Sequence, residues 1–214
     1  MNVPRFLRLP VFSNIGESLA IPPTSTSRRV MVVFGLPGTR KKSHCQLSAV
    51  GTTLHDLEIE EILDIGPDCG APSTHGRIPV KRMGVLTAAE IGDILTESRF
   101  GFVPHPAITL AKSGIFAAFS ALGTIPVIGK PFFGEVDGLK DGIQMLSPGT
   151  VLLHRESGLQ PISTAAWHWY SGHRLHVHAA TYAQILFAIP VETALDIPTN
   201  ARLLEESNGP HGVK

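Results

Sequence analysis

The sequence predicts an α/β fold with a doubly wound parallel sheet of the Rossmann-like kind, and three observations support it. Short apolar runs alternate with helix-length segments along most of the chain, the pattern of parallel strands joined by crossover helices. The first run, residues 30–34, is continuously apolar, as expected for a strand covered on both faces. With 43% hydrophobic residues among 214, the chain can also bury a full core.

The alternation begins at residue 29 and sets the order of the elements. The strand at 30–34 leads into a turn-rich loop at 35–42 and a helix at 43–55. Thr87 and Glu90 have the spacing of a capping box, which predicts the start of a later helix. Further strands are expected at residues 60–65, 78–81, 100–103 and 126–128, and further helices at 87–97, 111–122 and 163–188. Residues 134–153 are rich in loops, with room for one more strand.

The chain divides into three segments. Residues 1–28 are rich in proline, serine and threonine, which predicts an extended lead-in or inter-domain linker. Residues 29–190 form one α/β domain that includes the C-terminal helix. Residues 191–214 are a tail.

Charge and hydropathy exclude several classes of partner. Lys and Arg (18) balance Asp and Glu (18), so the basic stripe of a nucleic-acid-binding protein is not expected. The apolar runs fall short of the ~20 residues of a membrane span, and the N-terminus lacks the apolar core of a signal peptide. We therefore expect a cytoplasmic protein without an integral membrane segment, in which Cys45 and Cys69 are reduced thiols.

The loop at residues 35–42 is the first candidate ligand site, because ligands of such sheets bind beyond the carboxyl ends of the strands. Gly35 and Gly38 allow close approach of the backbone, and Arg40, Lys41 and Lys42 supply the positive charge that suits a diphosphate. The spacing matches neither a P-loop nor the dinucleotide fingerprint. A solvated basic loop is the alternative.

The second candidate is Lys112, Ser113 and Gly114, which we place in the first turn of the helix that follows the strand at 100–103. The helix dipole disfavours a cation there, so a lysine makes better sense if an anion binds beside it. The backbone amides and the Ser113 hydroxyl could then hold a pyrophosphate. Alternatively, Lys112 faces solvent and Gly114 serves close packing of the helix on the sheet.

Histidines offer a weaker signal. His173 and His176 are three residues apart on a predicted helix, but they lack an acidic neighbour, so a packing helix is favoured over a zinc site. His44, His55 and His75 are isolated in the sequence and are interpreted as surface or turn residues. We assign no metal, no cofactor and no catalytic residue.

The order of these segments resembles the donor-binding, C-terminal domain of glycosyltransferases of the GT-B type, in particular the retaining group-one kind. Residues 80–86, 88–96 and 100–104 match a strand ending in a Gly-x-Leu turn, a helix, and a strand ending in Pro. Residues 121–128 are similar to the closing Gly, Pro, Val, Ile stretch. Residues 9–15 resemble the junction at which the acceptor domain hands over to the donor domain.

The resemblance implies a function: transfer of a sugar from a nucleoside-diphosphate sugar to an acceptor that the sequence does not identify. It also implies that the acceptor domain is missing from this chain, which is then either a truncated product or a standalone donor domain; the partners expected are that missing domain or a second copy in a homo-oligomer. The donor diphosphate is expected at Gly35, Gly38, Arg40, Lys41, Lys112, Ser113 and Gly114. The nucleotide is expected at Gly84, Leu86, Pro104 and His105, with the base stacking near Pro104 and His105.

One departure from the family pattern supports a second interpretation. The retaining group carries two glutamates, eight positions apart, around the diphosphate helix. Aligning Gly114 with the family's glycine puts Ala111 and Phe119 at those positions. Because neither is acidic, the alternative is a non-catalytic module with a nucleotide-sugar-binding fold that acts as a binding or scaffold protein.

Overall fold

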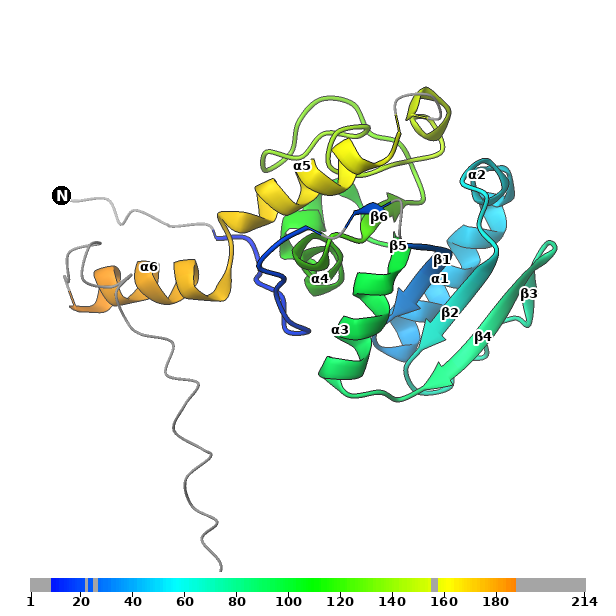
Figure 1. The fold of residues 1–214 in the computed structure, drawn as a ribbon, viewed down its shortest axis with the longest axis horizontal. Helices are drawn as coiled ribbons and strands as arrows, with labels where there is room; N and C mark the ends of the chain where they lie inside the picture. The colour runs from blue at the N-terminus through cyan, green and yellow to red at the C-terminus, as the bar shows by residue number, and fades with distance from the viewer. Residues whose placement is uncertain (1–8, 22, 25–26, 155–157, 188–214) are drawn as a thin grey trace, which may run out of the picture. The chain divides into compact units, whose positions relative to one another are not determined.

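The computed structural model describes residues 9–21, 23–24, 27–154 and 158–187, and the chain divides into two compact units, Met1–Leu175 and His176–Lys214. The first unit is an α/β domain built around one sheet (Figure 1). Its strands are β1 (Arg28–Phe34), β2 (Glu61–Ile65), β3 (Thr74–His75), β4 (Ile78–Gly84), β5 (Ser98–Val103) and β6 (Ile125–Ile128). Its helices are α1 (Pro37–Ala49), α2 (Gly51–Asp56), α3 (Ala88–Glu97), α4 (Gly114–Leu122) and α5 (Gln160–Ser171), with 3-10 turns η2 (Ala107–Lys112) and η3 (Val151–His154).

The sheet has the order β3-β4-β2-β1-β5-β6, and every pairing is parallel except that of β3 with β4. The five strands expected from the sequence are confirmed, and the doubly wound fold with them. The two-residue β3, which pairs antiparallel with the start of β4, was not predicted. The expected extra strand within residues 134–153 is replaced by loops with isolated β-bridges and by η3.

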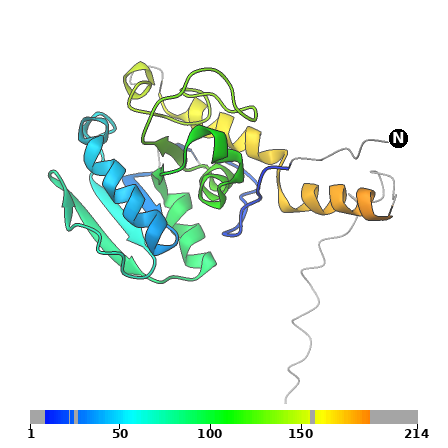
Figure 2. The same ribbon diagram turned by 180° about the vertical axis from the view of Figure 1, so that it is seen from behind.

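Both faces of the sheet are covered, which explains the continuously apolar β1. Val32 points into a core beneath α3, α4 and α5, and Met31 into a second core beneath α1 and α2; neither side chain is exposed. Figure 1 shows α3 on the near face, and Figure 2 shows α1 on the opposite one. The pattern of a strand buried on both faces was therefore read correctly.

The first helix begins earlier than predicted. α1 begins at Pro37, in the first turn, where proline is tolerated because its missing N–H would have no partner. The start expected at residue 43 is wrong by six residues, and Lys41 and Lys42 lie on the helix instead of in a loop. The predicted 43–55 helix is divided at Val50 into α1 and α2.

The capping box of α3 is confirmed. The Thr87 hydroxyl accepts a hydrogen bond from the backbone N–H of Glu90 at 3.3 Å, and the Glu90 carboxylate accepts one from the Thr87 N–H at 2.8 Å. The next helix differs from expectation. Residues 107–112 form η2, and α4 begins at Gly114 with Ser113 as its N-cap. Lys112 therefore precedes the cap and does not lie in the first turn.

The prediction of a single helix at residues 163–188 is wrong. α5 ends at Ser171, and a separate helix α6 (Leu175–Phe187) follows, most of it in the second unit. Within the described residues, none of the helices is both long and apolar enough to cross a membrane. Residues 1–8 of the predicted lead-in and the predicted tail at 191–214 lie outside the described residues.

The described part of the lead-in packs on the domain. The Tyr170 hydroxyl of α5 accepts a hydrogen bond from the Ser13 N–H at 2.8 Å and donates one to Glu17 at 2.6 Å. Burial and the bond to Glu17 raise the pKa of Tyr170. The Val11 N–H donates to the Ala111 carbonyl at 2.8 Å. Residues 11–17 are therefore fixed against η2 and α5.

Candidate functional site

The sheet changes direction between β1 and β5. From β1 the chain builds outward through β2 and β4, and then returns to the other side of β1 to add β5 and β6. In doubly wound sheets, ligands bind outside the carboxyl ends of the strands at such a switch point. The two loops singled out in the sequence, after residues 34 and 103, leave the two strands at this point. The topology therefore brings the two candidate regions together.

The turn after β1 contacts the start of α4 directly. Gly35 has a φ of +125°, which favours glycine, and a Cβ built there would lie 3.2 Å from Cδ1 of Ile115. Gly38 follows in the first turn of α1, exposed and with open space around its Cα. Lys41 and Lys42 are exposed on α1. Gly35 and Gly38 thus leave the backbone at this edge open to a ligand.

The start of α4 is held by a pair of side chains. Ser113, which is buried, accepts a hydrogen bond from the Phe116 N–H at 3.2 Å, and its Oγ lies 2.7 Å from Nδ1 of His105. A Cβ built on Gly114 would have no atom within 4 Å, so this glycine is not there for close packing on the sheet. Lys112 is exposed just before the cap. Gly114 and the exposed Lys112 are accessible at the helix start.

A pocket of about 410 Å³ opens at this edge, between the ends of β1, β2 and β4 and the start of α4. Three of the predicted site residues, Gly35, Leu86 and Gly114, line it. The other lining residues are Asn14, Ile15, Phe34, Leu36, Thr39, Ile65, Gly66, Val85, Ile91 and Ile115. The walls are mostly aliphatic, with backbone from three glycines, so the pocket suits a flat apolar group beside a polar one.

Two of the predicted nucleotide contacts, Gly84 and Pro104, do not line the pocket. Gly84 ends β4 with a φ of +72°, and its carbonyl accepts a hydrogen bond from the Gly66 N–H at 2.7 Å, so it shapes the turn that carries Leu86. Pro104 is buried, and its carbonyl accepts a hydrogen bond from Gln46 at 3.2 Å. The expectation that a base stacks on Pro104 is therefore wrong, because the ring is covered by protein.

The prediction that Arg40 binds the donor diphosphate is also wrong. Its side chain is 1% exposed and forms a two-pronged ion pair with Asp64 of β2, with Nε to Oδ1 at 2.8 Å and Nη2 to Oδ2 at 2.6 Å. Nη1 donates to the Pro67 carbonyl. Because α1 begins at Pro37, Arg40 lies on the helix face that packs against the sheet. It braces the carboxyl edge from inside and is not available to a diphosphate.

His44 and His75 are not the surface or turn residues expected. Both are buried, and Nδ1 of His44 lies 2.9 Å from Nε2 of His75. Nε2 of His44 lies 3.0 Å from Oδ1 of Asp64 and donates to this carboxylate, and one N–H lies between Nδ1 of His44 and Nε2 of His75. Burial, followed by the charge of His44, lowers the pKa of His75. His55, in contrast, is exposed as expected.

His44, Asp64 and Cys69 come close enough for a metal ion, with ligand atoms within 4.8 Å of one another. Both carboxylate oxygens of Asp64 are already engaged, by Arg40 and His44. A cation would also lie beside the guanidinium of Arg40, which repels it. The cluster therefore fits a buried hydrogen-bond network better than a metal site.

Sequence reasoning missed Gly66, Thr39 and Asn14, which line the pocket. Gly66 had a usable signal, since a glycine directly after a predicted strand often marks a backbone with positive φ; its φ is +138°. A Cβ on Gly66 would lie 2.8 Å from the Gly35 carbonyl. Asn14 sits in the irregular lead-in, where no periodic pattern could indicate it.

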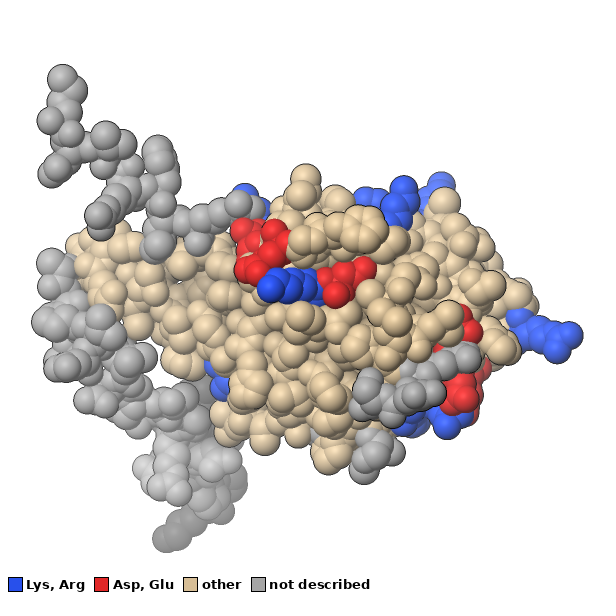
Figure 3. All heavy atoms as spheres, turned by 90° about the horizontal axis from the view of Figure 1, so that it is seen from above, with Lys and Arg blue, Asp and Glu red and all other residues tan. Residues whose placement is uncertain are grey.

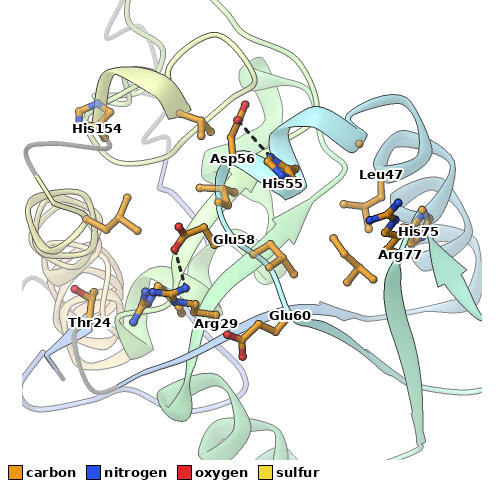
Figure 4. A pocket seen from close by; sticks show the side chains of 18 of the residues that line it. Thr24, Arg29, Leu47, His55, Asp56, Glu58, Glu60, His75, Arg77 and His154 are labelled. Atoms are coloured by element: carbon orange, nitrogen blue, oxygen red, sulfur yellow. Dashed lines mark ion pairs between the residues drawn. The ribbon is translucent and has the colours of Figure 1, made fainter.

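A larger cavity, of about 1410 Å³, lies at the opposite, amino end of the strands. Figure 4 shows acidic and basic side chains of both signs around it, with Arg29 paired to Glu58. That pair joins Nη1 to Oε2 at 2.8 Å and is half-exposed. The acidic and basic side chains around this cavity compensate one another, and the cavity lies away from the switch point. We therefore place the candidate site at the carboxyl edge.

On the face drawn in Figure 3, charged side chains are few and of both signs. This agrees with the zero formal net charge of the sequence. Lys41 and Lys42 on α1 and Lys112 just before α4 are exposed, but none of them lines the pocket.

Comparison with known proteins gives a fold. No protein-family model and no curated protein matches the chain. Among solved structures, the pneumococcal O-GlcNAc transferase GtfA, in complex with UDP and GlcNAc, matches with a TM-score of 0.50 at 10% identity, over 87% of this chain and 39% of GtfA.

Two further solved structures match with a TM-score of 0.40. WaaG, a glycosyltransferase involved in lipopolysaccharide biosynthesis, has 14% identity over 89% of this chain and 55% of WaaG. A UDP-N-acetylglucosamine 2-epimerase from Listeria monocytogenes has 13% identity over 76% of this chain and 46% of that protein. The chain thus spans about half or less of the length of the proteins it matches. At these identities the likeness shows the fold alone: the chain is a Rossmann-like α/β domain of the kind found in glycosyltransferases of the GT-B type, as the sequence predicts.

Proposed function

We propose that the carboxyl edge binds a nucleoside-diphosphate sugar, and that the chain is the donor-binding part of a two-domain sugar-transferring enzyme. The diphosphate lies between the Gly35 turn and the start of α4, near Lys41 and Lys112. The base enters the aliphatic pocket beside Leu86. The acceptor is bound by protein outside the described residues.

The observation that carries this proposal is the meeting of two glycine turns at the switch point. Gly35 and Gly114 line the same pocket, and Ile115 contacts the Gly35 turn. Backbone amides at a helix start, with exposed lysines nearby, form a site for phosphate without any side-chain nucleophile. Sugar transfer needs charge stabilisation on the departing diphosphate, which such a site supplies.

Exposed apolar side chains support the view that a second body covers this edge. One stands in the loop after each of four strands: Leu36 after β1, Val85 after β4, Ile108 after β5 and Phe133 after β6. Their exposed fractions are 75%, 75%, 67% and 97%. Leu36 and Val85 also line the pocket, and exposed apolar groups beside a site are typical of a surface that contacts another domain.

Substitution of Lys112 tests the diphosphate position. By calorimetry, we expect Lys112→Ala to weaken binding of UDP or GDP ten- to a hundredfold, because it removes a charge-assisted contact of roughly 1.5–3 kcal/mol. Lys112 is exposed and precedes the N-cap, so the unfolding temperature without nucleotide should not change.

The matched control is Lys81→Ala, an exposed lysine on β4 that, unlike Lys112, is not next to the start of α4 in the chain. Equal affinity of both variants and the wild type would show that the diphosphate site is misplaced. If neither nucleotide binds the folded wild type at millimolar concentration, the proposed function fails.

A second candidate, a non-catalytic binding or scaffold module, is favoured by one observation. The two positions where the retaining group carries glutamates are core positions here: Ala111 is 4% exposed and Phe119 not at all. Phe119 also packs edge-on against Phe34, with ring centroids 5.3 Å apart. Hydrolysis of a UDP- or GDP-sugar by this chain, followed by release of free sugar, would exclude this candidate.

A further inference from the structure

His105 stands at the switch point with one ring nitrogen engaged and the other free for a ligand. It follows β5 directly, and its Nδ1 lies 2.7 Å from Oγ of Ser113. Oγ of Ser113 also accepts the Phe116 N–H, and its second lone pair can accept from Nδ1 just as its own proton can be donated to Nδ1. Nε2 makes no hydrogen bond within the described residues, and it is not a buried unpartnered atom, so solvent reaches it.

The surroundings of His105 favour its neutral form. Burial, followed by the charge of Lys42 on α1, lowers the pKa of His105 below its ordinary value of 6.5. Lys42 of α1 is the charged group that acts on the imidazole, and Ser113 at the start of α4 is its hydrogen-bond partner. An anion that binds beside the imidazole favours its charged form and therefore raises its pKa.

Protonation is compatible with the fold. An imidazolium at residue 105 would donate from Nδ1 to the Ser113 Oγ, whose second lone pair can still accept the Phe116 N–H. The N-cap of α4 is therefore kept in both protonation states. The two states differ in the charge of His105, and in the protonated state the Ser113 hydroxyl proton cannot point at Nδ1.

We propose that His105 links binding at this edge to a proton: it takes up one proton as the diphosphate binds, and its Nε2–H donates to a phosphate oxygen. The proton comes from solvent and returns there on release. This proposal rests on the proposed function, and it adds that the site binds its donor more tightly in mildly acidic conditions. His105 is then a ligand contact as well as a support for the N-cap.

The test is calorimetry with UDP-glucose and GDP-glucose, whose diphosphate is a diester without a titrating proton near neutrality. Each is titrated from pH 8 to pH 6, in buffers with different heats of ionisation, to count the protons taken up. One bound proton changes the dissociation constant by at most about tenfold per pH unit. We expect an affinity gain of several-fold between pH 8 and pH 6 and an uptake of up to one proton.

The test variant is His105→Gln, which keeps a hydrogen-bond donor but does not titrate. It should bind without pH dependence and without proton uptake. The matched control is His55→Gln, an exposed histidine that lines the cavity at the amino end of the strands, and it should behave as the wild type. Thermal unfolding of each variant confirms that it is folded.

A second readout does not depend on a ligand. By NMR of the imidazole nitrogens, His105 in the free protein should titrate below 6.5, and Lys42→Gln should raise its pKa. If a nucleotide sugar binds but His105→Gln shows the same pH dependence as the wild type, the proton link is wrong and the proposed function stands. If neither nucleotide sugar binds at any pH, both fail.

Discussion

Asp64 joins three parts of the carboxyl edge through one buried charge. The carboxylate on β2 accepts hydrogen bonds from Arg40 and His44 of α1, and Arg40 continues to the Pro67 carbonyl beyond β2. Burial alone would raise the pKa of Asp64, but the hydrogen bonds from Arg40 and His44 outweigh it and lower the pKa to about 2. The carboxylate therefore stays charged throughout the neutral range and fixes α1 to the strand.

The pH dependence of stability follows from this shift. A carboxyl group whose pKa is lowered from 3.8 to about 2 on folding stabilises the protein above pH 4, and that stability is lost as the pH falls to 2. The amount is on the order of 2 kcal/mol. Asp64→Asn should lack this part of the acid transition and should be less stable at pH 7 by about 3–5 kcal/mol, because Arg40 is left buried and unpaired.

Urea unfolding at pH 7 and at pH 2–4 checks both statements. Asp93→Asn, an exposed aspartate on α3, is the matched control and should follow the wild type. An Asp64→Asn protein as stable as the control would mean that the ion pair contributes nothing net.

These residues show why part of the site was predictable and part was not. The two glycine turns at residues 35 and 114 could be found, because turn chemistry after a strand is local. Arg40 was misplaced because the helix start was set six residues late. With the start at Pro37, Arg40 and His44 are four residues apart on one helix face, and an aspartate within the apolar strand at 61–65 needs such partners.

At the scale of elements, β5 and α4 pack closely because residue 101 of β5 is a glycine and has no side chain. Gly101 of β5 lies under the ring of Phe119, and a Cβ built there would be 2.3 Å from two ring atoms. Phe119 is fully buried in α4, so its ring has no free space to move into. The absence of a Cβ at residue 101 lets the helix that starts at the candidate site lie close to the sheet.

We expect Gly101→Ala to destabilise the domain by about 1–3 kcal/mol, the usual range for overpacking a core. Gly114→Ala is the matched control, since the same methyl group there would meet no atom within 4 Å, and alanine is favoured over glycine in a helix. Its unfolding temperature should equal or exceed that of the wild type. Equal destabilisation by the two changes would contradict this account of the packing.

Elements with strong local signals were predicted, and those decided by tertiary contacts were not. The capping box of Thr87 fixed the start of α3 correctly, because both hydrogen bonds are local. The break between α5 and α6 falls at residues 172–174, where the sequence offers one glycine and no proline. β3 is two residues long and exists by pairing with β4 at residues 78–79, which no periodicity indicates.

At the scale of the whole molecule, the order of the strands in the sheet determines which loops meet at the candidate site. Alternating strands and helices predicted a doubly wound sheet, but not which strands would be neighbours. The order places β5 beside β1, although 63 residues separate the end of β1 at 34 from the start of β5 at 98. The two glycine turns lie next to each other only because β5 is adjacent to β1. The two motifs singled out in the sequence therefore belong to a single candidate site.

The central position of β1 has a consequence for how the chain is made. Among the strands of this sheet β1 is made first, and its two neighbours follow later, β2 near residue 61 and β5 only at residue 98. Until then, a nascent chain carries an apolar strand with an unpaired edge, which is prone to pair with other chains. We expect ribosome-bound chains ending at residue 97 to recruit chaperones or aggregate, and chains extended past residue 130 by enough to clear the exit tunnel to become protease-resistant. Limited proteolysis of stalled nascent chains of both lengths measures this, and resistance at residue 97 would show that β1 is protected before β5 arrives.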